Sequence, residues 1–143
     1  MQTPLYIAQI TDTHLYAEPH GQLLGLDTRH CLKQVIDLPL NTRAPDLVVA
    51  SGDLSHDGSP QAYRHLHACF SRLQAPIYCV PGNHDETEAL RANADCGRLC
   101  NSRSICIGGW LQVFLDSTIK GSEGGHLTET ELQDLDTALA SHP

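Results

Sequence analysis

Three short apolar runs, each followed by a polar turn, constrain the fold of this chain more than any other feature. The runs and the polar residues after them are 5–10 with Asp12 and His14, 47–50 with Gly52 and Asp53, and 77–80 with Gly82, Asn83, His84 and Asp85. A short apolar run bounded by turn-forming residues predicts a buried β-strand. Each group of polar side chains therefore follows a strand end, which is where open α/β sheets bind their ligands.

Helical patterns separate the predicted strands and indicate a β-α-β order. The segments are 28–41, capped by Asp27 or Thr28; 59–73, with Ser59 as N-cap before Pro60; and the short segment 86–94. The apolar positions expected to face the sheet are Leu32, Val35, Ile36 and Leu38 in the first helix and Tyr63, Leu66, Cys69, Phe70 and Leu73 in the second. Crossovers between parallel strands are right-handed, so we expect the three strand ends at one edge of the sheet.

The last third of the chain predicts a hairpin and a final helix. Gly108 and Gly109 separate the strand-like segments 104–107 and 110–115. Thr128 and Glu131 predict a capping box, and the helix that follows carries Leu132, Leu135 and Leu139 on one face. The segments 17–25, 95–102 and the glycine-rich 121–125 are expected to lack regular structure.

The composition indicates one globular domain over residues 1–143, because a chain of 143 residues that is 41% hydrophobic can bury a core. The formal net charge of −8 argues against a nucleic-acid partner, since such proteins carry basic patches. The N-terminus has neither a basic segment nor a long apolar stretch, which predicts no membrane association and a cytoplasmic location. The six cysteines form no C-x-x-C pair, so we expect thiols, and the spacing of Cys96, Cys100 and Cys106 argues against zinc.

Carboxylate, imidazole and amide groups at three neighbouring strand ends predict a metal site. This donor set suits Mn²⁺, Fe or Zn²⁺, and a carboxylate can bridge two ions that activate hydroxide for attack on phosphorus. Taken singly, the residues have simpler interpretations: Asp12 can cap a turn, His56 can be a loop residue, and His65 and His67 can lie in solvent beside the second helix. The order of the three groups, each at a strand end, favours the metal site.

The ordered motifs resemble those of the calcineurin-like metallophosphoesterase superfamily, which are D-x-H, G-D-x-x and G-N-H-D/E. They stand here as Asp12-Thr13-His14, Gly52-Asp53 and Gly82-Asn83-His84-Asp85. Within the superfamily, the chain from about residue 5 to its end looks most like the bacterial class III 3',5'-cyclic-AMP phosphodiesterases. The segments that carry this likeness are 9–15, Leu23-Leu24-Gly25, Leu115-Asp116-Ser117 and Gly125-His126-Leu127-Thr128 leading into Glu131-Leu132. The resemblance implies an α/β fold, a β-sandwich flanked by helices, of which this chain carries the N-terminal part.

The resemblance also implies a role for each matching residue. Asp12 and His14 would hold one divalent ion, Asp53 would bridge it to a second, and Asn83 would bind the second. The two ions would be Fe or Mn, with Zn as an alternative. His84 would lie beside the scissile phosphate and either stabilise its charge or protonate the leaving 3'-oxygen. His14, Asp53 and Asn83 would also contact the substrate. A hydroxide bridging the ions would be the nucleophile, and the small molecule cyclic AMP would yield 5'-AMP.

Two departures from the family pattern bear on activity. His56 stands three positions after Asp53, where many relatives carry an acid that orients the motif histidine, and either Asp57 takes over that role or it is lost. The later H-H-P-like and G-H-x-H segments that complete the site in the family are missing, and His142-Pro143 follows the last helix without a strand to carry it. We therefore expect an incomplete second sheet, and little or no hydrolysis of cyclic AMP by this chain alone with Mn²⁺.

Three functions stay open at this point. The leading one is a metal-dependent phosphodiesterase that acts on 3',5'-cyclic AMP. The second is a phosphoesterase of the same superfamily with another phosphodiester or a monoester as substrate. The third is a truncated or decayed domain that binds metal or nucleotide without turnover. The sequence predicts no oligomeric state.

Overall fold

A four-stranded parallel sheet lies at the centre of the computed structural model, which describes residues 4–94, 99–100 and 102–142. The strands run in the order β1 (Ile7–Ile10), β4 (Leu47–Ser51), β5 (Ile77–Val80) and β6 (Leu99–Cys100). The three strands predicted from the sequence are therefore present, adjacent and parallel. The expectation that 95–102 lacks regular structure is wrong for β6, which pairs with β5, while 95–98 and 101 lie outside the described residues.

The register of the sheet places the carboxyl ends of its first three strands level with one another. Ile10 is the partner of Ala50, and Ser51 is the partner of Val80. Since side chains alternate between the two faces of a strand, this register also decides which apolar residues share a face. The polar turns that follow the three strands consequently begin at the same edge of the sheet.

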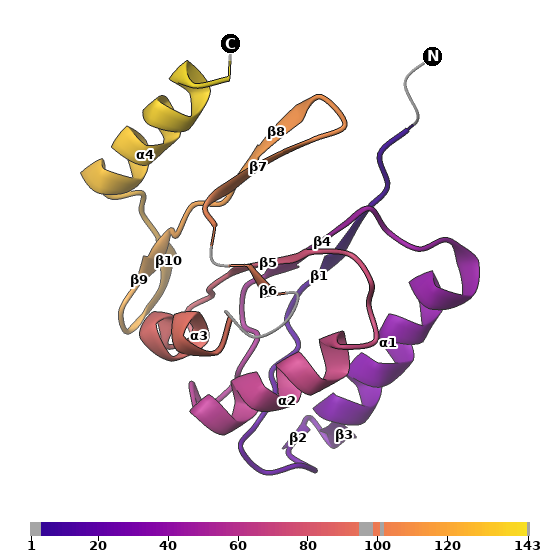
Figure 1. Cartoon of the computed structure of the whole chain (residues 1–143). Coiled ribbons are helices and arrows are strands. Elements are labelled where there is room, and N and C mark those ends of the chain that lie inside the picture. Colours follow the sequence, from indigo (N-terminus) through magenta and orange to yellow (C-terminus); the bar gives the residue numbers. More distant parts are fainter. Residues whose placement is uncertain (1–3, 95–98, 101, 143) are drawn as a thin grey trace.

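Three helices cover one face of this sheet: α1 (Thr28–Thr42), α2 (Pro60–Phe70) and α3 (Thr87–Ala94). Figure 1 shows α1 and α2 side by side beneath the strands. Their buried side chains form one core with the strands, made of Ile10, Val48, Ala50, Ile77, Leu32, Ile36, Tyr63, Leu66, Phe70 and Leu90, among others. In α1 the predicted apolar stripe is only half right. Leu32 and Ile36 are buried, whereas Leu38 is exposed and Val35 lines an open hollow beside Leu23 and Leu26.

The start signals of α1 and α2 are confirmed. The Asp27 carboxylate accepts a hydrogen bond from the His30 backbone N–H at 2.8 Å, and the Ser59 hydroxyl accepts one from Ala62 N–H at 3.1 Å. Both bonds satisfy donors that the first turn of a helix leaves unpaired. All five apolar positions predicted for the second segment are buried, although α2 itself ends at Phe70 and Leu73 lies just beyond it.

A β-hairpin formed by β7 (Ser104–Ile107) and β8 (Trp110–Val113) lies on the other side of the sheet from α1 and α2 (Figure 1). Gly108 and Gly109 both have positive φ, 60° and 81°, as a two-residue turn between twisted strands requires. Beyond the hairpin, Phe114 stacks on Tyr78 of β5 with ring centroids 4.6 Å apart. The predicted hairpin is confirmed, and its end is attached to the sheet through this aromatic pair.

Two segments expected to be irregular each form a small hairpin instead. One joins β2 (Gln22–Leu23) to β3 (Leu26–Asp27), and the other joins β9 (Thr118–Ile119) to β10 (Ser122–Gly125). Gly25 and Gly121 lie in the turns, with φ of 81° and 74°, whereas Gly124 and Gly125 lie in β10 itself. The short strands have no apolar alternation that would reveal them in the sequence.

The last helix, α4 (Glu129–Ala140), begins as predicted and packs differently. Thr128 Oγ1 accepts a hydrogen bond from Glu131 N–H at 3.2 Å, but the Glu131 side chain does not complete the capping box. Its carboxylate is buried and accepts hydrogen bonds from the Arg103 guanidinium and, at 3.0 Å, from Asp116 N–H. Of the predicted leucine face, Leu132 and Leu139 are exposed and Leu135 is half-buried, so the buried anchor of the helix is the charged Glu131.

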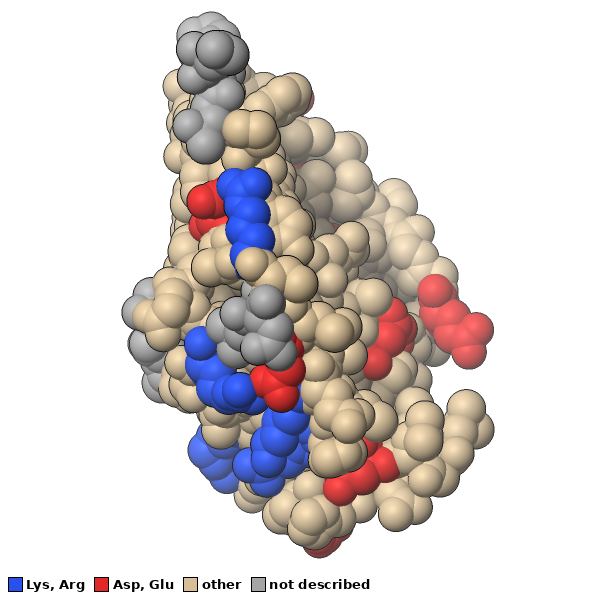
Figure 2. Space-filling model, turned by 90° about the vertical axis from the view of Figure 1, so that its right-hand side faces the viewer, with Lys and Arg blue, Asp and Glu red and all other residues tan. Residues whose placement is uncertain are grey.

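Charged side chains of both signs lie together on the surface. Figure 2, which views the side of the molecule that carries α1, shows lysine and arginine side chains gathered on the lower part of that face, with acidic ones beside them. Arg29, Lys33 and Arg72 lie near the buried thiol of Cys69 and act to lower its pKa, although burial outweighs them and raises that pKa overall. Within the described part of the chain, no helix is long and apolar enough to cross a membrane. Cys96, which was weighed with Cys100 and Cys106 as a zinc ligand, lies outside the described residues.

Replacing Glu131 tests how α4 is held. We expect Glu131→Ala to lower the free energy of unfolding by about 2 kcal/mol, because the guanidinium of Arg103 and the Asp116 N–H both lose a charged acceptor. Urea unfolding followed by circular dichroism measures the change. Glu129→Ala is the matched control, since Glu129 lies in the same first turn but is exposed. Equal losses in the two variants would contradict an anchoring role for Glu131.

Candidate metal centre

The loops that follow β1 and β4 run alongside each other and hold the first two motifs in register. Asp12 N–H donates to Gly52 O at 3.1 Å, and His14 N–H donates to Asp53 O at 2.9 Å. Gly52 N–H in turn donates to Val80 O at 2.8 Å, which connects the same loop to β5. The parallel pairing of the strands thus continues past their ends and brings Asp12, His14 and Asp53 together through the backbone.

Three residues of this region have a backbone conformation that non-glycine residues seldom adopt. The φ angles of Asp12, His14 and Asp53 are 56°, 41° and 49°, in the left-handed region. Such conformations cost energy and persist only where the surroundings impose them, which is common at functional sites. Here the inter-loop hydrogen bonds impose them, and the result is that the three side chains turn toward one another.

Gly82 lets the third loop approach the second without an intervening side chain. A β-carbon at Gly82 would overlap the backbone nitrogen and the carboxylate of Asp53. The turn after Gly82 then aims His84 N–H at Asp53 Oδ1, to which it donates at 3.0 Å. Glycine is required here by close approach, and not by its own φ angle, because Gly82 has no positive φ.

The Asp85 carboxylate joins the second and third loops, and both of its oxygens are occupied by hydrogen bonds. Oδ1 accepts hydrogen bonds from Ser55 N–H at 2.8 Å and from the Tyr63 hydroxyl at 3.0 Å. Oδ2 accepts from Leu54 N–H at 3.0 Å and from Gly82 N–H at 2.8 Å. Burial and the neighbouring Asp85 carboxylate raise the pKa of Tyr63, so its hydroxyl keeps the proton that it donates. Asp85 therefore positions the site and has no oxygen left for a cation.

Asp12, His14 and Asp53 form a group that can hold a divalent cation. His14 Nε2 lies 3.9 Å from Asp12 Oδ1 and 3.8 Å from Asp53 Oδ2, and the potential ligand atoms of the three residues all lie within 4.8 Å of one another. The side chains of His14 and Asp53 are 15% and 16% exposed, whereas that of Asp12 is 62% exposed. Two carboxylates around an imidazole nitrogen match the ligands that Mn²⁺, Fe and Zn²⁺ prefer, so the residues present fit such an ion.

His56 joins the centre although the sequence indicated only a loop residue. Its Nδ1 lies 3.3 Å from Nδ1 of His14, and its ring stacks on that of His84 with centroids 4.7 Å apart. Burial lowers the pKa of His56, and the nearby His84 and His14 lower it further. The neutral ring can therefore accept a hydrogen bond from an N–H group. A histidine that binds a metal through one nitrogen usually donates a hydrogen bond from the other. His56 is placed to accept that bond from His14.

Asp57 does not take over the orienting role that the sequence left open. Its Oδ2 accepts a hydrogen bond from Ala17 N–H at 2.8 Å, and its Oδ1 accepts from Ser59 N–H and from the Ser55 hydroxyl, both at 3.1 Å. Burial acts to raise the pKa of Asp57, but these hydrogen bonds outweigh it and lower the pKa overall. The Asp57 carboxylate is therefore occupied by hydrogen bonds to the loop before β2 and to the start of α2.

The sequence signal that could have identified His56 as part of the centre is its position three residues after Asp53.

His84 and Asn83 occupy the turn after β5. His84 Nδ1 lies 3.2 Å from the carbonyl oxygen of His56, and since a carbonyl only accepts, Nδ1 carries a proton and Nε2 is left to exchange one. The His84 and His14 rings meet edge to face with centroids 5.1 Å apart. Asn83 is exposed beside His84, and both residues line a neighbouring cavity of about 430 Å³.

His65, which was expected to lie in solvent, is half-buried and donates a hydrogen bond to Tyr16 O at 3.0 Å.

Replacing His56 tests whether it orients His14. We expect His56→Ala to weaken Mn²⁺ binding by about 10–100-fold, the usual effect of removing a hydrogen-bond partner of a metal-binding histidine. Isothermal titration calorimetry with MnCl₂ measures the affinity, and His67→Ala on α2 is the control. An unchanged affinity would contradict the role, and a complete loss of binding would make His56 a ligand in its own right.

Replacing Asp85 tests how the loops are held together. We expect Asp85→Ala to lower the free energy of unfolding by about 2–4 kcal/mol, because four donors lose a charged acceptor at once. Asp85→Asn is expected to lie between this variant and the unchanged protein, since the amide keeps one accepting oxygen. Urea unfolding provides the values, with Asp136→Ala on the exposed side of α4 as control. A neutral Asp85→Ala variant would refute the anchoring role.

Comparison with known proteins agrees with this geometry. The family model described as calcineurin-like phosphoesterase matches residues 5–137. Two 3',5'-cyclic adenosine monophosphate phosphodiesterases CpdA are similar to this chain. The one of Pseudomonas aeruginosa is 35% identical over 94% of the chain, and the one of Escherichia coli K12 is 36% identical over 96% of it. A 3',5'-cyclic-nucleotide phosphodiesterase of Nostoc is 35% identical over 98% of the chain. The chain spans about half the length of these curated relatives, 50% of the first two and 53% of the third. Because the family model covers nearly the whole chain, this protein belongs to the calcineurin-like phosphoesterase family.

Proposed function

We propose that this chain takes part in the metal-dependent hydrolysis of a phosphodiester, with 3',5'-cyclic AMP as substrate and 5'-AMP as product. One observation carries the proposal: the loops after β1 and β4 bring the ligand atoms of Asp12, His14 and Asp53 within 4.8 Å of one another, and the turn after β5 places the His84 ring against that of His14. The cyclic nucleotide is favoured because the similar proteins named above carry that substrate in their names.

In this proposal Asp12 and His14 hold one divalent ion, Asp53 is shared with a second, and Asn83 contributes to the second. Divalent ions bound there supply a nucleophile at neutral pH by lowering the pKa of water, and they neutralise charge on the phosphoryl oxygens. Asp53 suits the shared position because its backbone and carboxylate are both held, by the β1 loop and by His84 N–H. His14 is oriented by His56, as argued above.

His84 is proposed to handle the proton of the leaving group. In the hydrolysis a water oxygen bonds to phosphorus, the bond from phosphorus to the 3'-oxygen breaks, and that oxygen takes up a proton. His84 Nδ1 already donates to a carbonyl, so a protonated ring can deliver only the proton on Nε2. General acid assistance of this kind contributes about 10²–10⁴-fold to rate.

A panel of three substrates tests the proposal: 3',5'-cyclic AMP, 2',3'-cyclic AMP and bis(p-nitrophenyl) phosphate, each with Mn²⁺ and with EDTA. We expect any cleavage by this chain alone to be slow, as stated above, with 3',5'-cyclic AMP cleaved fastest of the three to yield 5'-AMP and no cleavage in EDTA, as measured by liquid chromatography. Cleavage of the aryl diester without any of cyclic AMP would assign a different substrate. A chain that binds no Mn²⁺ by calorimetry would refute the metal centre itself.

Two variants separate the role of a shared ligand from that of a proton donor. We expect Asp53→Ala to remove binding of both ions, and His84→Ala to keep Mn²⁺ bound while turnover falls by about 100-fold or more. Metal content measured by plasma spectrometry is compared with the rate on the best substrate of the panel. Equal loss of metal in both variants would show that His84 is a ligand, contrary to the proposal.

A further inference from the structure

The β9–β10 hairpin forms a wall of the cavity that opens beside the candidate metal centre. This cavity, of about 430 Å³, lies between the turn after β5, the start of α3 and the hairpin. Its lining residues include Asn83 and His84 on one side and Thr118, Ile119 and Lys120 on the other. A phosphate group bound in this cavity would therefore have His84 on one side and the hairpin on the other.

Lys120 is the cation of this cavity. It lies in the turn between β9 and β10, and among the described residues that line the cavity no other lysine or arginine occurs. Its Nζ lies 4.0 Å from Glu86 Oε1, with the two side chains 91% and 61% exposed. An ion pair so long and so exposed stabilises little, because water screens it. The ammonium group is thus held near the cavity and is free to exchange its partner for another anion.

The acids around the cavity have partners of their own. Asp85 is bonded to four donors, and Glu88 lies 3.4 Å from the Arg91 guanidinium. Glu86 is the acid that Lys120 itself approaches. An anion that takes up Lys120 consequently leaves Glu86 as the one carboxylate of these three without its cation.

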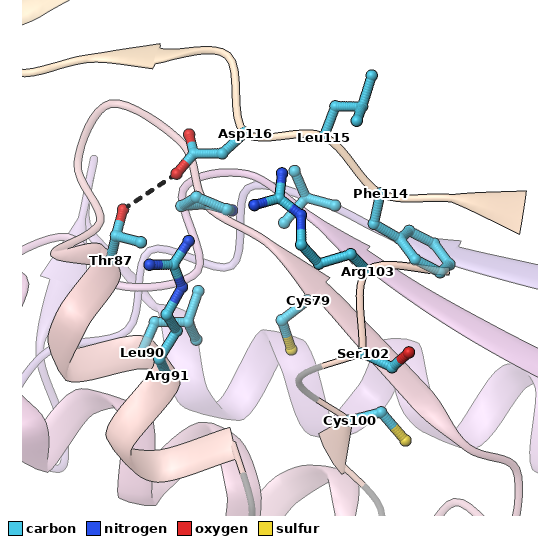
Figure 3. Close-up of a pocket in the computed structure, with 12 residues that line it drawn as sticks. Cys79, Thr87, Leu90, Arg91, Cys100, Ser102, Arg103, Phe114, Leu115 and Asp116 are labelled. Carbon is cyan, nitrogen blue, oxygen red and sulfur yellow. Dashed lines mark hydrogen bonds between the residues drawn. The ribbon is translucent and has the colours of Figure 1, made fainter. Parts of the chain in front are cut away.

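The hairpin is fixed to the molecule, so the place of Lys120 is set by structure and not by chance. Asp116 Oδ1 accepts hydrogen bonds from Thr118 N–H at 2.9 Å and from the Thr118 hydroxyl at 2.6 Å. Asp116 Oδ2 accepts a longer one, 3.4 Å, from the hydroxyl of Thr87 in α3, which Figure 3 shows as a dashed line. Asp116 N–H donates to the buried carboxylate of Glu131 at 3.0 Å. One carboxylate thus joins the base of the hairpin to α3, and a second holds it to α4.

We propose that Lys120 is a substrate-binding residue that contacts an anionic oxygen of the phosphodiester or of its phosphomonoester product. This inference rests on the proposed function and adds to it the residue that holds the anion from the hairpin side. An ammonium group offers three donors and a full charge, and a charge-assisted hydrogen bond is among the stronger polar contacts. While the cavity is empty the ammonium group lies near Glu86, and it exchanges that weak contact for the anion when the anion binds.

Binding of 5'-AMP to the Mn²⁺-loaded chain tests the inference without requiring turnover. We expect Lys120→Ala to weaken the binding about 10-fold, and Lys120→Arg to stay within about 3-fold of the unchanged chain. Lys33→Ala is the matched control, since Lys33 is an exposed lysine on α1. Calorimetry with 5'-AMP gives the affinities, and a preceding titration with MnCl₂ shows whether the metal centre is intact.

The outcomes separate this inference from the function on which it rests. Equal affinity for 5'-AMP in Lys120→Ala and the unchanged chain, with Mn²⁺ bound in both, overturns the role of Lys120 and leaves the metal centre standing. Absence of Mn²⁺ binding in the unchanged chain overturns the proposed function. Glu86→Gln adds a second check: it should strengthen 5'-AMP binding 2–3-fold by freeing the ammonium group, and a weakened affinity would contradict the exchange of partners.

Discussion

The carboxylate of Asp85 is the interaction on which the rest of the site depends. It takes hydrogen bonds from two loops and a helix, so it holds the end of β4 and the turn after β5 at a distance that the glycine at position 82 alone allows. An ionised acid with every lone pair in use is a rigid joint, since displacing any donor would leave a charge partly unsatisfied. The ligand residues can keep their left-handed backbone conformations because the Asp85 hydrogen bonds hold the neighbouring loops in place.

The chemistry of the centre follows from which groups are left without such partners. Asp53 and His14 face each other across the joined loops, and their nitrogen and oxygen atoms are near but not in contact. At that distance a cation could bind to both atoms, and its charge would offset that of the carboxylate. His56 sharpens this arrangement because a neutral ring behind His14 accepts a hydrogen bond and adds no negative charge to a site that already has two carboxylates.

Patterns of period and position predicted most of the fold, and they predicted which side chains the strand ends bring together. β1, β4, β5 and the first two helices follow from apolar runs and caps, and Asp12, His14, Asp53 and His84 converge because parallel strands end together. The failures have a common cause. Short hairpins such as β9–β10 lack a hydrophobic alternation, and the exposed leucines of α4 depend on what packs against the helix, which a single helix cannot reveal. The contributions of His56 and Glu131 arise from contacts between residues far apart in the sequence.

The left-handed conformations of Asp12, His14 and Asp53 have a consequence for folding. The three residues come from two loops about forty positions apart, and their side chains converge only when β1 and β4 are paired. An ion that binds them recognises the paired strands and not the unfolded chain, so its binding energy is added to the folding equilibrium. An ion at a concentration 100 times its dissociation constant would add about 2.7 kcal/mol in this way. A metal ion bound at this centre would then also stabilise the pairing of the edge strand β1 with β4.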